Sequence, residues 1–260
     1  MPRCSIRCFG VGSGFPTADR GHSAFLYRIG SESLLIDCGD GLTARYEAAG
    51  ISYDQFGSLI LSHQHGDHVG GFLMFLQSMW LRQRQRALEV RVGGDGLDIL
   101  RRMSHAAYLF PELFNFDIKW APIRAGRSFN AGRVRVTPHN TTHLQSFIRR
   151  FRARYRLQFD AFSFLLESGR TRIAHSADLG TPADLDPLLR KPVTALVCEL
   201  AHFTPDDLFD YLAGRSIGKL VLVHLIDRYW EDRRTILQHA SRALPKTKCF
   251  IARPGEEIAL

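Results

Sequence analysis

Six consecutive positions in this chain hold four side chains that suit a metal ion. The stretch His63-Gln64-His65-Gly66-Asp67-His68 carries three imidazoles and one carboxylate, directly after an apolar run. His and Asp bind divalent ions such as zinc, at about 2.0–2.2 Å. On a helix, His63 and His65 would point about 200° apart, whereas in extended backbone residues i and i+2 face the same side. The spacing therefore predicts a metal site formed where a strand ends.

Further candidate ligands follow other apolar, strand-like segments in the same way. They are Asp37 after 34–36, His139 and His143 after 134–137, His175 and Asp178 after 171–174, and His224 after 220–223. Ligands on loops at one edge of an α/β scaffold are a common way to build a site. A solvated, histidine-rich loop is the alternative for 63–68, and the repeated context argues against it.

The hydrophobic pattern supplies the elements that must position these residues. It predicts strands near 5–9, 24–29, 33–37, 58–61, 89–92, 116–120, 133–137, 161–166, 172–175, 195–199, 219–224 and 248–251. It predicts helices near 42–49, 71–84, 97–107, 182–189, 205–212 and 231–243. Strands followed by helices indicate an α/β protein.

The ordered set of motifs resembles the metallo-β-lactamase superfamily. Within it, the segments Gly10–Thr17 and Leu222–Tyr229 are similar to ribonuclease Z, the endonuclease that trims the 3′ end of tRNA precursors. The resemblance implies a four-layer αββα sandwich, with the metals at one edge of the two sheets. It covers nearly the whole chain, so we expect residues 1–260 to form a single hydrolase domain.

The resemblance also implies a role for each candidate ligand. One metal ion would be held by His63, His65 and His143; the second by Asp67, His68 and His224; Asp178 would bridge them, and Asp37 would orient a ligand imidazole. His139 is the rival of His143, which we prefer because Thr-Thr-His-Leu resembles the third motif of related hydrolases. The expected cofactors are two divalent ions, zinc first, with manganese or iron as alternatives.

Three departures from ribonuclease Z bear on substrate and mechanism. The long Gly-, Pro- and Lys-rich arm of that family is not visible in this sequence, and Ala177 stands where a Gly usually precedes the bridging Asp. The His-Glu-Ala-Thr motif is replaced by Cys198-Glu199-Leu200-Ala201-His202. His202 is either a general acid, which would join Asp67 as a catalytic residue, or a structural histidine that opens a helix.

The charge of the predicted centre favours an anionic substrate. Five neutral imidazoles and two carboxylates around two divalent ions leave about two positive charges, or about one once a metal-bound hydroxide forms as nucleophile. We therefore expect a hydrolase acting on a phosphodiester, in RNA or a nucleotide. The alternatives are a small-molecule esterase, thioesterase or lactonase with the same metals, or a non-catalytic nucleic-acid-binding protein.

The basic residues also favour acidic partners. The chain has 34 Lys+Arg and 26 Asp+Glu, a net charge of +8. Arg149, Arg150 and Arg152 lie among aromatic residues just after His143 and are candidate phosphate contacts, as is Arg228. A solvated amphipathic helix is the competing interpretation of the segment 147–156.

The remaining features indicate the cellular compartment of the protein. The five cysteines, Cys4, Cys8, Cys38, Cys198 and Cys249, lack metal-binding spacing and are expected to be reduced in the cytoplasm. We expect no signal peptide and no membrane partner, because no apolar run is long enough to span a bilayer. A homodimer is expected from the resemblance alone.

Overall fold

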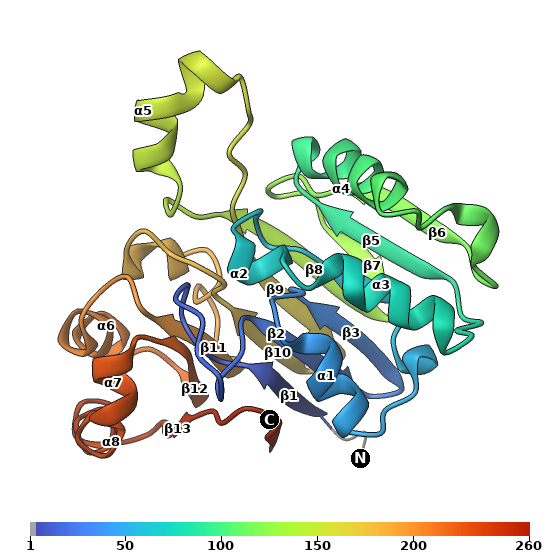
Figure 1. The fold of residues 1–260 in the computed structure, drawn as a ribbon. Helices are drawn as coiled ribbons and strands as arrows, with labels where there is room; N and C mark the ends of the chain where they lie inside the picture. The colour runs from blue at the N-terminus through green and yellow to red at the C-terminus, as the bar shows by residue number, and fades with distance from the viewer. Residues whose placement is uncertain (1–3) are drawn as a thin grey trace.

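The computed structural model describes residues 4–260, and in it two seven-stranded sheets lie face to face (Figure 1). The first sheet has the order β14-β1-β2-β3-β4-β5-β6, and the second β13-β12-β11-β10-β9-β8-β7. The first contains β1 (Cys4–Gly10), β2 (Ala24–Ile29), β3 (Glu32–Ile36), β4 (Ser58–Ile60), β5 (Leu88–Val92), β6 (Ile118–Pro122) and β14 (Glu257–Ala259). The second contains β7 (Phe129–Ala131), β8 (Val134–Asn140), β9 (Phe162–Ser168), β10 (Thr171–His175), β11 (Val193–Leu200), β12 (Ile217–Leu225) and β13 (Lys248–Ile251).

Each sheet is antiparallel in one part and parallel in the other. Strands β3 to β6 run parallel to one another, as do β10 to β13. The carboxyl ends of parallel strands meet at one edge, where loops can carry functional groups. An isolated bridge between Gly12 and Leu225 joins the two sheets beside the end of β12.

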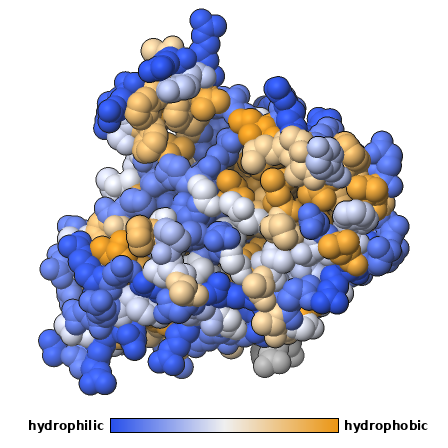
Figure 2. Space-filling model, in the orientation of Figure 1, coloured by the Kyte–Doolittle hydropathy of each residue, from blue (hydrophilic) through white to orange (hydrophobic). Residues whose placement is uncertain are grey.

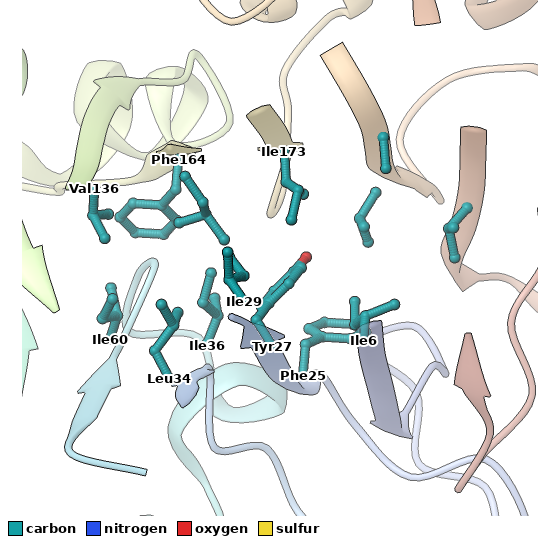
Figure 3. Packing of buried hydrophobic residues seen from close by; sticks show 14 of the residues in the cluster. Ile6, Phe25, Tyr27, Ile29, Leu34, Ile36, Ile60, Val136, Phe164 and Ile173 are labelled. Carbon is teal, nitrogen blue, oxygen red and sulfur yellow. The ribbon is translucent and has the colours of Figure 1, made fainter. Parts of the chain in front are cut away.

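Apolar side chains from both sheets fill the space between them. Figure 3 shows this packing, with Ile36 and Tyr27 from the first sheet opposite Phe164 and Ile173 from the second. The alternation of side chains along a strand sends every second residue into this core and the others to the outer face. The outer faces are apolar as well, so each must be covered.

Helices cover those outer faces. The helices are α1 (Leu42–Ala48), α2 (Gly66–Val69), α3 (Phe72–Leu81), α4 (Gly94–Ala106), α5 (Gln145–Tyr155), α6 (Pro205–Leu212), α7 (Asp227–Glu231) and α8 (Arg233–Ala243), with short 3-10 turns η1 (Tyr53–Gln55), η2 (Pro111–Leu113) and η3 (Pro182–Leu185). Residues of α1, α3 and α4 form a second core with the first sheet, and residues of α6 and α8 form a third with the second sheet. The predicted four-layer αββα arrangement is confirmed.

Several predicted boundaries were wrong. The helix expected over 182–189 is only the turn η3, because Pro187 has no N–H to donate to the carbonyl of Ala183. The helix expected over 231–243 is two helices, of which α7 begins earlier, and β6 lies two residues later than the predicted strand at 116–120. The short strands β7 and β14 were not predicted. Within residues 4–260, no helix has the length and apolar content needed to cross a bilayer.

Candidate metal centre

The chain's strand ends bring seven side chains together at one edge of the two sheets. Their ligand atoms form two groups, and within each group all of these atoms lie within 4.8 Å of one another. The first group is His63, His65, His143 and Asp178, and the second is Asp67, His68, Asp178 and His224. Both sheets contribute, since the first sheet leads into 63–68 through β4, and the second leads into Asp178 and His224 through β10 and β12.

Imidazole nitrogens converge in the first group. His65 Nδ1 lies 3.0 Å from His63 Nε2 and 3.1 Å from His143 Nε2. Asp178 Oδ2 lies 3.5 Å from His143 Nε2 and 3.7 Å from His63 Nε2. Three nitrogens and one oxygen thus surround one point.

The other oxygen of Asp178 belongs to the second group. Asp178 Oδ1 lies 3.2 Å from His68 Nε2 and 3.5 Å from His224 Nε2. Asp67 Oδ2 is 3.5 Å from His68 Nε2 and 3.7 Å from His224 Nε2. One carboxylate therefore faces both groups, with one oxygen toward each.

These residues fit a pair of divalent cations. Among residues 4–260, His68 Nε2 and Asp178 Oδ1 are buried without a hydrogen-bond partner, which is costly for groups of this polarity. A cation between them would satisfy both atoms. Imidazole and carboxylate donors without thiolate suit zinc and also manganese or iron.

The imidazoles of the first group are held in the form that binds metal. Burial lowers the pKa of His63 well below its usual value, and burial lowers the pKa of His143 to about 4. Burial also lowers the pKa of His65. Metal ligation requires neutral imidazole. Because these residues are already neutral at neutral pH, they need not release a proton when a cation binds.

Hydrogen bonds from neighbouring residues fix two ligand rings. His68 Nδ1 donates to the buried Asp37 at 2.7 Å, which leaves His68 Nε2 for the centre. Asp37 also accepts from the backbone N–H and the hydroxyl of Ser62, at 2.7 and 2.9 Å. On the other side, Ser23 Oγ lies 3.2 Å from His224 Nδ1. Such contacts select the tautomer and orientation of a ligand imidazole.

The backbone is strained where these residues leave their strands. Asp37, Ala177 and His224 have φ angles of 62°, 47° and 55°, in the left-handed region. This conformation costs a residue with a Cβ about 1–2 kcal/mol and is found where function requires it. Ala177 directly precedes Asp178, so the strain at this position turns the carboxylate toward both groups.

The structure separates the two rival histidines. His143 lies in the first group, whereas His139 lies on β8, paired with Ser163 of β9, and in neither group. His175 is buried between the sheets, where its Nδ1 lies 2.8 Å from the hydroxyl of Tyr27. It is not part of either group.

His202 lies at the open side of the centre. Its ring centroid is 4.6 Å from that of His143 and 6.0 Å from that of His224, and its side chain is 34% exposed. Its Nδ1 lies 2.8 Å from Oε1 of Glu199, which is only 1% exposed. Burial alone would lower the pKa of His202, but the hydrogen bond and charge of Glu199 outweigh burial and raise it.

The candidate arginines all lie on exposed helix surfaces. Arg149, Arg150 and Arg152 belong to α5, which has no buried residue and projects away from the sheets (Figure 1). Arg228 lies on α7, where it donates to the Tyr229 hydroxyl at 2.9 Å.

Sequence reasoning missed three features of the site: the hydroxyls of Ser23 and Ser62, the anchoring of His202 by Glu199, and a contact between Phe147 and His65. The ring centroids of Phe147 and His65 are 5.4 Å apart. Ser62 is adjacent to the metal motif, and its position offered a signal. Glu199 lies three residues before His202, so this contact also offered a local signal. The contacts of Ser23 with His224 and of Phe147 with His65 join segments far apart in the sequence, which gives no sign of them.

Comparisons with known proteins agree with this fold. A family model described as "Anti-Pycsar protein Apyc1" matches residues 4–202. A ribonuclease Z of Bradyrhizobium diazoefficiens is 24% identical over 292 residues, which cover 94% of this chain and 96% of the relative.

Two solved structures share the whole architecture. The metallo-β-lactamase fold protein YhfI of Bacillus subtilis superposes with a TM-score of 0.76 at 18% identity, over 98% of this chain and 99% of that one. The short form of human tRNase Z gives a TM-score of 0.74 at 16% identity, over 98% of each chain. The chain therefore has the metallo-β-lactamase fold.

Proposed function

The chain belongs to the family of the anti-Pycsar protein Apyc1, and from this premise and the paired ligand groups we propose that it is a dinuclear metal-dependent hydrolase of phosphodiesters in RNA or a nucleotide. The observation that carries the proposal is the placement of Asp178, whose two oxygens face different sets of ligand nitrogens. A carboxylate in this position suits a bridge between two cations.

Each ligand has a proposed place. The first cation would bind His63, His65 and His143, and the second would bind Asp67, His68 and His224, with Asp178 between them. Zinc is the proposed ion, and the same nitrogen and oxygen donors would accept manganese or iron. Asp37 and Ser23 would hold two of the imidazoles in position.

Two divalent ions supply a Lewis-acid centre that activates water and stabilises negative charge developing on oxygen. The residues around it would do the rest. Asp67 is 11% exposed, and its carboxylate would also help to orient the attacking water. The net positive charge of the loaded site favours a substrate that is already anionic, such as a phosphodiester.

His202 is the proposed general acid. It is positioned at the open side of the centre, held through Nδ1 by Glu199, so that Nε2 is directed away from that contact. Glu199 is itself fixed by backbone N–H groups of Leu179 and Ala201, at 2.9 and 2.7 Å. A protonated imidazole held in this way would donate a proton to the leaving oxygen.

The surface residues support an anionic, extended substrate. Arg149, Arg150 and Arg152 lie on α5, the helix that follows His143, and Arg228 lies on α7, which follows His224. Guanidinium groups match phosphate oxygens in pairs. We place these four residues as substrate contacts outside the catalytic centre.

Cellular context and assembly are also part of the proposal. Free thiols at all five cysteines are consistent with one domain working in the reducing cytoplasm. Exposed apolar residues on α3 and α4, including Met74, Leu81 and Met103, make a surface that a second copy would cover (Figure 2). Sedimentation equilibrium of the purified chain would test for the homodimer.

The activity is tested with three substrates on one preparation of known metal content: bis(p-nitrophenyl) phosphate, p-nitrophenyl acetate and a lactone. We expect about two metal ions per chain and turnover of the diester. His65→Ala is expected to lose metal and turnover while keeping its circular dichroism spectrum. His139→Ala is the matched control, since this histidine lies outside both groups, and it should keep both.

The outcomes separate the alternatives. Full metal content with turnover of only the ester or the lactone would reject the phosphodiesterase and keep the metal centre. Undiminished diester turnover by His65→Ala in chelated buffer would reject the metal mechanism. Loss of metal in His139→Ala would overturn the assignment of His143.

A further inference from the structure

A row of aromatic side chains runs along α5 and starts at the metal centre. The ring of Phe147 lies 5.4 Å from the ring of His65, between centroids. Phe151 follows at 5.8 Å from Phe147, and Tyr155 at 6.2 Å from Phe151. Residues at i, i+4 and i+8 lie on one face of a helix, so the three rings form a continuous stripe.

This stripe is not part of the packing of the protein. Among residues 4–260, Phe147 belongs to none of the three apolar cores, and its side chain is 41% exposed. Tyr155 is 55% exposed. Figure 2 shows apolar surface gathered on the projecting helix, with hydrophilic residues at its outer end. Aromatic side chains that stabilise no core are available to a ligand.

Their surroundings indicate what kind of ligand. Arg150 and Arg154 lie over the rings of Phe151 and Tyr155, at 5.0 and 5.4 Å from the centroids. Aromatic faces beside guanidinium groups are the combination that stacks on bases while holding phosphates. Phe147 lies beside His65, a proposed ligand of the first cation, so a planar group bonded next to the reacting phosphate would lie within its reach.

We propose that Phe147 stacks on the nucleobase adjacent to the scissile phosphate and so selects diesters that carry a base over those that do not. The inference rests on the proposed function, because it requires a phosphodiester at the metal centre. Phe147 is in this view a specificity-determining residue for the reaction, and Phe151 and Tyr155 extend the surface for longer substrates.

The test compares substrates that share one phosphate and differ only in a base. Thymidylyl-thymidine is compared with two analogues in which one or the other nucleoside is replaced by an abasic sugar. Wild type is expected to hydrolyse the dinucleotide with a kcat/KM roughly tenfold above that of one abasic analogue, the size of effect that one stacked base gives. Phe147→Ala should lose this preference by slowing only the dinucleotide, while Phe147→Trp should keep it.

Two further measurements make the assignment specific. Tyr155→Ala is the matched control, because it removes an exposed ring from the same helix face but far from His65, and it should leave the preference unchanged. Binding of 2-aminopurine riboside monophosphate, which has no diester bond to hydrolyse, to the metal-loaded protein should quench the fluorescence of the base, and Phe147→Leu should abolish the quenching. This second readout does not depend on turnover.

The results distinguish the inference from the proposed function. Equal hydrolysis of all three diesters by wild type would keep the phosphodiesterase and overturn the role of Phe147. An equal loss on all three substrates in Phe147→Ala would mean that the ring only supports His65. A Phe147→Ala protein that dissociates in sedimentation, with its base preference intact, would make the stripe a contact between copies. Hydrolysis of none of the diesters by the metal-loaded wild type would overturn both proposals.

Discussion

Nδ1 of His202 lies 2.8 Å from Oε1 of Glu199, and Glu199 is buried while His202 is partly exposed. The carboxylate thus holds the imidazole at the open side of the metal centre and raises its pKa over the opposing effect of burial. A histidine held in this way stays protonated to higher pH than a free one. That property suits a proton donor for a leaving group.

We expect His202→Ala to slow poor leaving groups far more than good ones. Turnover of a dinucleotide should fall by about 10²–10⁴-fold, the usual contribution of a general acid. Turnover of bis(p-nitrophenyl) phosphate should change little, because p-nitrophenolate leaves without a proton. Glu199→Gln is the control for orientation and should give an intermediate loss on the dinucleotide. A uniform loss on both substrates would rule out proton donation by His202.

Because the backbone at Ala177 is left-handed, we expect substitution by glycine to change the stability of the protein less here than at an ordinary buried alanine. In Ala177→Gly the relief of about 1–2 kcal/mol of strain offsets the lost buried methyl and the added freedom of the unfolded chain. The change in the free energy of unfolding should therefore be small. Ala174→Gly on β10 loses a buried methyl without positive φ and serves as the control.

Denaturant unfolding in chelated buffer compares the two variants. Ala174→Gly should be less stable than Ala177→Gly by at least about 1 kcal/mol, which is the strain term alone. Equal losses at the two positions would show that the conformation of Ala177 stores no strain. Metal content should be retained in Ala177→Gly, because the glycine still permits the turn that directs Asp178.

The residue pattern was enough to predict an α/β protein and the convergence of the ligands for a physical reason, whereas the four layers were implied only by the resemblance to the metallo-β-lactamase superfamily. Ligand types at strand ends are local features, and parallel strands bring their carboxyl ends to a common edge. His63, His65, Asp67 and His68 are adjacent in the chain, so they could be identified together. His143 could be distinguished from His139 only by resemblance, since both follow the same strand.

The remaining features were missed for two reasons: one depends on a tertiary contact that leaves no local pattern, and the others have local causes that were not recognised. The contact of Phe147 with His65 arises because α5 begins just after His143, which lies in the first ligand group, and α5 itself has no buried residue to reveal its placement. The anchoring of His202 is by contrast local, since Glu199 at the end of β11 is only three residues away, and this spacing in the sequence was not recognised. The 3-10 turn at 182–185 differs from the expected helix because one proline interrupts an otherwise helical pattern.

We expect the protein to lose stability in mild acid because His175 is buried. It is fully buried beside Tyr27, and burial lowers its pKa to about 4 from the ordinary histidine value of 6.5. The unfolded chain binds a proton at His175 more readily than the folded chain does. The contribution of the neutral His175 to the free energy of unfolding is therefore fully present above the pKa that this residue has in the unfolded chain. It is lost as the pH falls from there toward the folded pKa.

Unfolding in chelated buffer at about pH 7.5 and about pH 5 measures this term, which should amount to about 2 kcal/mol over that interval. Other buried histidines also titrate in this range, so the informative quantity is the difference between wild type and His175→Asn. Asn keeps a polar partner for the Tyr27 hydroxyl but does not titrate. An identical pH dependence in the two proteins would show that His175 gains its proton without unfolding the chain.

We expect the salt dependence of oligonucleotide binding to arise largely from the arginines of α5. If Arg149, Arg150 and Arg152 contact phosphates, each contact on a single strand adds about 0.7 to the slope of log K against log salt. Replacing all three with Gln should raise KM for a single-stranded oligonucleotide at low salt and lower that slope by up to about 2.

Replacing Arg101, Arg102 and Arg242, which are exposed on α4 and α8, removes the same net charge elsewhere and is the matched control. A slope that falls equally in both triple variants would assign the effect to the overall charge of the protein, and an unchanged slope in the α5 variant would make these arginines ordinary surface residues.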